Sequence, residues 1–128
     1  MTIPDDRMYS KDHEWVLVTG DKARVGITDY AQKQLGDVVF VELRQAGTRL
    51  DAGDPFGTVE SVKSVSEVYM PVSGTIAATS SDLVDDPETV STDPYGDGWM
   101  IEITVSDKAQ LDALLSAAEY EKYIKDAE

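Results

Sequence analysis

Lys63 is the only basic residue within the segment VESVKSVSEVYMPVSG, residues 59–74, and it lies between Glu60 and Glu67. A lysine ε-amine held in solvent is a nucleophile that can be acylated, and a group joined to it hangs from a long, flexible side chain. We therefore consider the hypothesis that Lys63 is an attachment point for a group that the polypeptide itself lacks. Spacing alone favours the simpler interpretation, a solvated lysine on a β-turn, because lysines are mostly exposed.

Few other residues could do chemistry. The chain has no cysteine, which excludes disulfides, thiolate metal sites and cysteine nucleophiles. His13 is the only histidine, and no triad spacing surrounds it, so we interpret it as structural, either hydrogen-bonded or packed beside Trp15. The aspartates at 82, 85 and 86 lack the ligand register of a calcium loop.

A β-hairpin over about residues 55–70 is the element that we expect to position Lys63. Four valines recur at every third residue, a spacing that fits neither a clean strand nor a clean helix: Val59, Val62, Val65 and Val68. The competing interpretation is an amphipathic helix. The dense β-branched content, with Gly57 before the run and Pro71 after it, favours the hairpin.

The predicted hairpin turns at Val62 and Lys63, since a type I turn requires no glycine at its two central positions. The serines that flank these residues would pair beside the turn. Glu60 and Glu67 would then occupy neighbouring, nearly mirrored positions. In this arrangement Lys63 projects, fully exposed, from the tip of a rigid ribbon.

Short β-like segments dominate the first hundred residues and predict a sandwich or barrel-like β fold. They are rich in Val, Ile, Thr and aromatic residues and are separated by Gly, Asp or Pro. Gly20 and Asp21 form a natural hairpin turn between two of them. We expect strands at residues 13–20, 22–27, 37–43, 55–62, 65–70, 74–79 and 98–105.

Two regions have helical patterns, and we expect both to cover the sheets. Thr28 is placed as the N-cap and Gly36 as the stop of a short helix near residues 28–35. The C-terminal segment, about residues 107–126, has a helical period of leucines and is expected to form a helical pair. Ser116 and Glu119 form a capping-box pattern, which predicts that the second helix begins near Ser116.

The bulk composition narrows the possible partners. A chain of 128 residues fits one domain, so we predict a single unit over residues 1–128. Twenty-five acidic against eleven basic residues give a net charge of −14, which disfavours binding to nucleic acid or to anionic membranes. The first ten residues resemble neither a signal peptide nor a transit peptide. We therefore expect a cytoplasmic, monomeric prokaryotic protein without nucleic-acid or membrane partners.

Four further stretches accompany residues 59–74 in a fixed order: YSKDHEWV (9–16), VGITDYAQKQLGDVVFVEL (25–43), DPYGDGWMIEI (93–103) and LLSAAEYEKYI (114–124). Together these stretches cover nearly the whole chain. They closely resemble the H-protein family of the glycine cleavage system. A lone Glu-Ser-Val-Lys would be a weak signal, whereas an ordered set of this length is specific.

The resemblance implies a mainly β fold with short helices, the barrel-sandwich hybrid of two antiparallel sheets that lipoyl and biotinyl domains share. It also implies that lipoic acid is joined to Lys63 by an amide bond, and that the chain is a carrier rather than an enzyme. In the family, the lipoyl arm takes an aminomethyl group from a PLP-dependent glycine decarboxylase to a tetrahydrofolate-dependent aminomethyltransferase. Dihydrolipoamide dehydrogenase reoxidises the arm, and a lipoate ligase or a lipoyl/octanoyl transferase attaches it.

The resemblance further implies a surface cleft in which the loaded arm is sheltered from water. Glu14 and Glu67 match acidic positions of that cleft, where they would hold the protonated amine through charge-assisted hydrogen bonds. Asp12 stands where a serine is common in the family. Without the resemblance, Glu14 would be interpreted as a solvated carboxylate at the end of a strand.

Three other functions are compatible with parts of this evidence. A lipoyl donor that passes lipoate to other complexes would use the same Lys63. A biotin acceptor domain has a related fold but typically places methionines beside its lysine, where this chain has Val62 and Ser64. An unmodified β-rich interaction module would carry no adduct, so an intact mass would distinguish the lipoyl, biotinyl and unmodified states.

Overall fold

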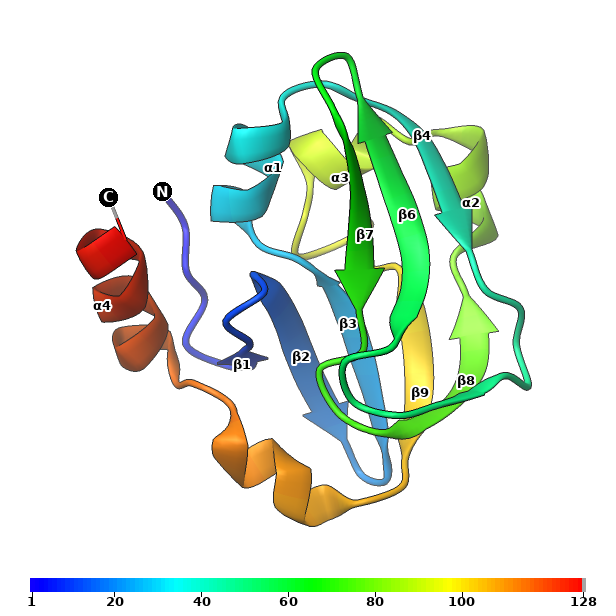
Figure 1. Ribbon diagram of the computed structural model, residues 1–128, viewed down its shortest axis with the longest axis vertical. Helices are drawn as coiled ribbons and strands as arrows, with labels where there is room; N and C mark the ends of the chain where they lie inside the picture. Colours follow the sequence, from blue (N-terminus) through cyan, green and yellow to red (C-terminus); the bar gives the residue numbers. More distant parts are fainter. Residues whose placement is uncertain (128) are drawn as a thin grey trace.

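The computed structural model describes residues 1–127, in which nine strands form two antiparallel sheets (Figure 1). The larger sheet has the strand order β1-β2-β3-β9-β8-β5, and the smaller has the order β4-β6-β7. The strands of the larger sheet are β1 (Met8–Tyr9), β2 (Glu14–Thr19), β3 (Lys22–Ile27), β9 (Ile101–Val105), β8 (Gly74–Thr79) and β5 (Arg49–Leu50). Those of the smaller sheet are β4 (Val38–Leu43), β6 (Pro55–Ser61) and β7 (Val65–Tyr69).

A hydrophobic core fills the space between the two sheets. Its buried side chains come from strands of both sheets, for example Val25 and Ile103 from the larger sheet and Val59 and Val68 from the smaller. Burial of apolar surface on this scale is the main source of folding free energy. The mainly β fold of two antiparallel sheets is therefore confirmed.

The β6–β7 hairpin is present as predicted, and its strands are paired in register. Glu60 lies opposite Val65 and Thr58 lies opposite Glu67, so the two glutamates are diagonal neighbours on one face. The opposite face carries Val59, which is fully buried. Since one face of each strand is buried and the other is exposed, the register is strongly specified. The helix interpretation of this segment is wrong.

Helix α1 (Asp29–Leu35) has the predicted caps. The Thr28 hydroxyl accepts a hydrogen bond from Ala31 N, and the Gly36 backbone N–H donates to Gln32 O. Gly36 adopts φ +81°, a conformation that side chains disfavour, which explains why the helix stops at a glycine.

The C-terminal segment is only partly as predicted. The capping box is confirmed: Ser116 N donates to Glu119 Oε1 over 2.9 Å, and α4 (Ala117–Ala127) follows. The expected helical pair is present, but its first member is a short 3₁₀ helix, η1 (Lys108–Ala113), which ends before Leu114 and Leu115. Leu115 instead pairs with Tyr9 as an isolated β-bridge, so the leucine period reflects packing against the sheet rather than one helical face.

Several short elements escaped the sequence analysis because they hold too few residues to show a period. These are β1 and β5, together with the helices α2 (Ser81–Asp85) and α3 (Thr89–Thr92). The aspartates at 82 and 85 therefore lie on α2 rather than in a loop. Within residues 1–127, the longest helices are too short and too polar to cross a membrane.

Candidate functional site

The tip of the β6–β7 hairpin is fixed by hydrogen bonds on both sides of the turn. Ser61 N donates to Ser64 O over 2.8 Å, and the Ser61 hydroxyl accepts from Lys63 N (3.2 Å) and Ser64 N (3.1 Å). Val62 N donates to Asp37 O over 3.1 Å, which ties the tip to the segment between α1 and β4. The predicted turn residues, Val62 and Lys63, are therefore correct. In a simple type I turn a backbone carbonyl accepts from the N–H at the position of Ser64, whereas here the Ser61 hydroxyl accepts that hydrogen bond.

Lys63 is exposed at this tip. The tip of the β6–β7 hairpin lies at the top of the molecule in Figure 1. The aliphatic stem of Lys63 lies across Gly36: a Cβ placed on Gly36 would stand 3.2 Å from Lys63 Cε. Gly36 follows Leu35, a residue of the cavity described next. The lysine stem thus starts from a rigid base and runs along the end of α1.

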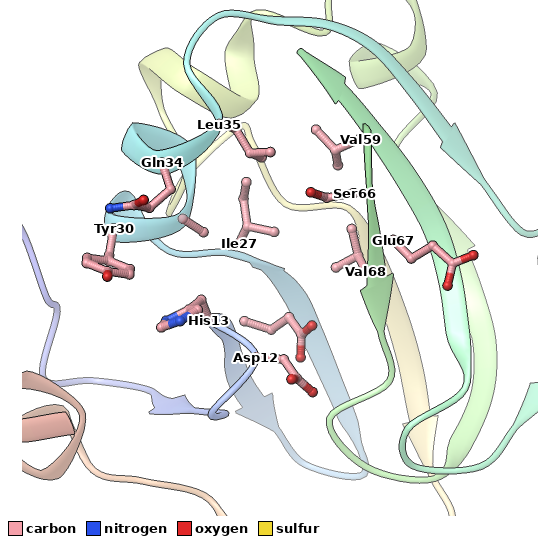
Figure 2. A pocket seen from close by; sticks show the side chains of 12 residues that line it. Asp12, His13, Ile27, Tyr30, Gln34, Leu35, Val59, Ser66, Glu67 and Val68 are labelled. Carbon is pink, nitrogen blue, oxygen red and sulfur yellow. The ribbon is translucent and has the colours of Figure 1, made fainter. Parts of the chain in front are cut away.

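A cavity of about 320 Å³ opens beside the hairpin, between α1, β7 and the loop that precedes β2 (Figure 2). Helix α1 forms one wall, and Glu14 with its two preceding residues forms the floor. The lining residues are Asp12, His13, Glu14, Ile27, Tyr30, Ala31, Gln34, Leu35, Val59, Ser66, Glu67 and Val68.

Glu14 is a buried carboxylate rather than a solvated one, since only 1% of the residue is exposed. The Ser10 hydroxyl donates to Oε1 over 2.8 Å, and Tyr69 N donates to Oε2 over 3.1 Å. Burial raises the pKa of Glu14 to about 7, although the hydrogen bonds from Ser10 and Tyr69 oppose the rise. The site therefore contains a desolvated acid that can change its charge near neutral pH.

Asp12 is a second carboxylate that lines this cavity (Figure 2). Its negative charge contributes to the raised pKa of Glu14 and opposes the lowering of the pKa of His13 that burial causes. Asp12 is exposed, in contrast to Glu14. The two acids thus give the floor of the cavity a negative potential at neutral pH.

Glu67 is placed differently from the expectation. It borders the cavity, but Figure 2 shows its side chain on the far side of β7, pointing away from the cavity. The alternation of side chains along a strand explains this, because Ser66 and Val68 face inward and Glu67 must face outward. Its charge acts on Tyr69 instead, whose pKa it raises.

His13 is structural, as interpreted, but its partners are tyrosines rather than Trp15. Its Nδ1 lies 2.9 Å from the Tyr120 hydroxyl, and its ring packs against Tyr30 with centroids 4.8 Å apart. Within residues 1–127 it is also the one non-glycine residue with positive φ, at +67°. Trp15 is buried in the neighbouring aromatic cluster, with its indole N–H donating to Pro94 O.

The sequence analysis missed the α1 wall and Tyr120. Tyr30 and Gln34 of the wall lie four residues apart, so a helical projection of residues 29–35 would have placed them on one face. Tyr120 lies 107 residues from His13, and no local pattern could have joined them. No group of three or more potential metal ligands occurs among residues 1–127, and the aspartates near residue 85 form no such site.

The model of the family "Glycine cleavage H-protein" matches residues 7–127. A probable glycine cleavage system H protein of Haloarcula marismortui is 55% identical over 96% of this chain and 97% of its own length. The glycine cleavage system H protein of Oceanobacillus iheyensis is 54% identical over 98% of this chain and 100% of its own.

Among solved structures, the crystal structure of a glycine cleavage system H protein from Mycobacterium marinum superposes with a TM-score of 0.85. It is 44% identical and covers 92% of this chain and 95% of its own. The agreement in sequence, length and fold leaves one conclusion: this chain belongs to the glycine cleavage H-protein family.

Proposed function

We propose that Lys63 is the residue through which this chain carries lipoic acid. As a member of its family, the chain is a lipoyl carrier of the glycine cleavage system and not a catalyst. The observation that supports the attachment site is an exposed amine on a hydrogen-bonded hairpin tip, with its stem directed along the end of α1 beside an acidic cavity.

The residues present fit this group. An amide bond needs an accessible amine, and within residues 1–127 no ion pair holds Lys63. When bound, lipoic acid supplies a dithiolane that can carry an aminomethyl group and, in its reduced form, two electrons. Lys63 supplies the flexible tether, and the fixed tip supplies the base from which it moves. Tethering of this kind keeps the cargo at a high effective concentration near any docked enzyme.

Glu14 is the residue that we propose to hold the carried amine. An ionised carboxylate accepts charge-assisted hydrogen bonds from an ammonium group, and such bonds are roughly twice as strong as neutral ones. Because Glu14 is buried, its negative charge is poorly solvated, so an incoming cation would lower its pKa and favour the ionised form. Asp12 adds a second negative charge to the lining of the cavity.

The partners follow from the same proposal. The chain exchanges cargo with a PLP-dependent glycine decarboxylase and a tetrahydrofolate-dependent aminomethyltransferase, and dihydrolipoamide dehydrogenase reoxidises it. A lipoate ligase or a lipoyl/octanoyl transferase acylates Lys63 in the cytoplasm. The net charge of −14 favours basic docking surfaces on these enzymes.

Peptide mapping by mass spectrometry tests the attachment site, on protein isolated from its native source. We expect one lipoyl adduct, on the peptide that contains Lys63. A biotinyl adduct, an unmodified chain, or an adduct on another lysine would each contradict the proposal. Incubation of purified apoprotein with a lipoate ligase, ATP and lipoate provides the same readout in vitro, with Lys63→Arg as the negative control.

A further inference from the structure

The Tyr120 hydroxyl contacts His13, which lines the cavity, and Thr28, which caps the helix that forms one of its walls. It stands 2.9 Å from His13 Nδ1 and 2.7 Å from the Thr28 hydroxyl. His13 belongs to the loop that presents Asp12 and Glu14, while Thr28 is the N-cap of α1. Tyr120 itself is not among the cavity-lining residues. One buried oxygen therefore joins the floor of the cavity to its helical wall.

The loop from Ser10 to Glu14 needs such support because its backbone is strained. His13 has φ +67°, and a single non-glycine residue in this region stores free energy that surrounding contacts must offset. Thr28 N donates to His13 O over 3.0 Å, and His13 N donates to Ser10 O over 3.1 Å. The left-handed turn at His13 sets the direction in which the chain enters β2, and with it the position of Glu14.

The α1 wall depends on the same oxygen. The Thr28 hydroxyl accepts the N-capping hydrogen bond from Ala31 N over 3.2 Å while it contacts Tyr120. Tyr30 and Gln34 of this helix line the cavity. A shift of Thr28 would therefore move the wall that faces Glu14.

Tyr120 is itself held firmly. Its residue is fully buried, and its ring stacks on Tyr9 with centroids 4.8 Å apart and an interplanar angle of 8°. In the tautomer of neutral His13 that accepts at Nδ1, the Tyr120 O–H donates to His13 and the Tyr120 oxygen can accept from the Thr28 O–H. Burial lowers the pKa of His13, which favours this neutral form.

We propose that Tyr120 is a positioning residue of the cavity. By binding both His13 and Thr28, it couples the C-terminal helix to the position of Glu14, and thereby to how well Glu14 shelters the carried amine from water. The inference rests on the proposed role of Glu14. Tyr120, a residue of α4 distant from the β6–β7 hairpin, thus joins the residues that determine the lifetime of the carried aminomethyl group.

Tyr120→Phe is the test variant, because it keeps the stacked ring and removes only the hydroxyl. Ile124→Val is the matched control on the same helix, because it removes buried apolar packing of α4 and changes no side-chain hydrogen bond. In the unmodified protein, we expect Tyr120→Phe to lower the pKa of Glu14 measured by carboxyl NMR and to change the ¹⁵N shift of His13 Nδ1. We also expect faster hydrogen exchange at Thr28 N, whose acceptor is His13 O.

In the methylamine-loaded protein, release of ammonia and formaldehyde should accelerate about three- to tenfold in Tyr120→Phe, as expected for the loss of one buried hydrogen bond. Ile124→Val should match the wild type in every readout. Release is measured at temperatures well below the unfolding midpoint of each variant, so that a general loss of stability does not mimic faster release.

The outcomes separate the two proposals. If Glu14→Gln speeds cargo loss and Tyr120→Phe changes neither the Glu14 pKa nor the rate, this inference is wrong and the proposed function stands. If Glu14→Gln has no effect on cargo loss, the shelter itself is wrong, and the inference fails with it. If Ile124→Val produces the same changes as Tyr120→Phe, the helix acts only through its packing, which also overturns the inference.

Discussion

The hairpin tip and the loop before β2 hold their functional side chains in opposite ways. At the tip, backbone and serine hydrogen bonds fix the chain while Lys63 points into solvent. In the loop, a strained residue and a remote tyrosine fix the chain while Glu14 is withdrawn from solvent. One region leaves an amine exposed to solvent, and the other keeps a carboxylate from water.

The difference follows from what each group must do. A tether needs freedom beyond a rigid anchor, so a short local network within residues 61–64 is enough. A desolvated carboxylate needs neighbouring polar groups that satisfy its hydrogen bonds, because an unpaired buried charge is costly. The support of Glu14 therefore involves Ser10 from the same loop and Tyr69 from the other sheet.

Replacement of the tether should have the largest effect. Lys63→Arg keeps the charge but cannot be acylated, so we expect complete loss of the lipoyl adduct and of glycine–CO₂ exchange with the decarboxylase. The far-UV circular dichroism and the unfolding midpoint should remain unchanged. Lys22→Arg, at an exposed lysine of β3, is the control and should retain both the adduct and the exchange. Persisting exchange in Lys63→Arg would refute the assignment.

Loss of the buried carboxylate should shorten the lifetime of the cargo. Glu14→Gln preserves the size of the side chain but removes its charge, so release of ammonia and formaldehyde from the loaded protein should increase about tenfold or more. The wild-type rate should itself fall as pH rises through the pKa of Glu14 in the loaded protein, which lies below the value of about 7 for the empty cavity because the bound ammonium favours the ionised form. A variant rate equal to that of the wild type at pH 8 would remove Glu14 from the mechanism.

The raised pKa of Glu14 also predicts how stability depends on pH. The pKa rises from 4.5 to about 7 on folding, so the folded state binds the proton more tightly than the unfolded state. The stability advantage of wild type over Glu14→Gln should be fully present below pH 4.5 and should fall by up to about 3 kcal/mol as pH rises through 7. Urea unfolding of both proteins across this range measures the difference, and a flat difference would show that Glu14 titrates normally.

Gly36→Ala should destabilise the junction between the tip and α1 by about 2 kcal/mol, because φ +81° strains any side chain and the new Cβ would press on the Lys63 stem. Acylation of Lys63 by a ligase should also slow. Gly47→Ala is the matched control: its φ is +93°, yet no atom lies within 4 Å of the added Cβ. Gly47→Ala should lose stability without any change in the acylation of Lys63. Equal acylation rates in Gly36→Ala and Gly47→Ala would show that the contact between residue 36 and the Lys63 stem is unimportant.

The smallest effect is expected at the turn itself. Ser61→Ala removes a hydroxyl that accepts from two backbone N–H groups, so unfolding free energy should fall by about 1 kcal/mol. Ser64→Ala, in the same turn, removes a hydroxyl that forms no hydrogen bond within residues 1–127 and should have little effect. Equal midpoints of thermal unfolding for the two variants would show that the serine network does not stabilise the tip.

Local patterns were sufficient for the hairpin and for the helix caps. The β-branched run with its flanking Gly57 and Pro71 predicted the strands, and the Thr28 and Ser116 motifs predicted the starts of α1 and α4. These features depend on residues close in sequence, which is why they can be read from it. The side-chain direction of Glu67 could also have been predicted, since strand alternation places it opposite the buried Val68.

The sequence by itself determined that a lysine would sit in an exposed turn between β-strands, because turn chemistry and strand alternation act over a few residues. Only the tertiary structure decided that Glu14 is buried, that its pKa is raised, and that Tyr120 holds the loop before it. Those properties arise from groups as far as 107 residues apart, Tyr120 and His13, brought into contact by packing. Desolvation is a property of the assembled surroundings, and no single segment of the chain encodes it.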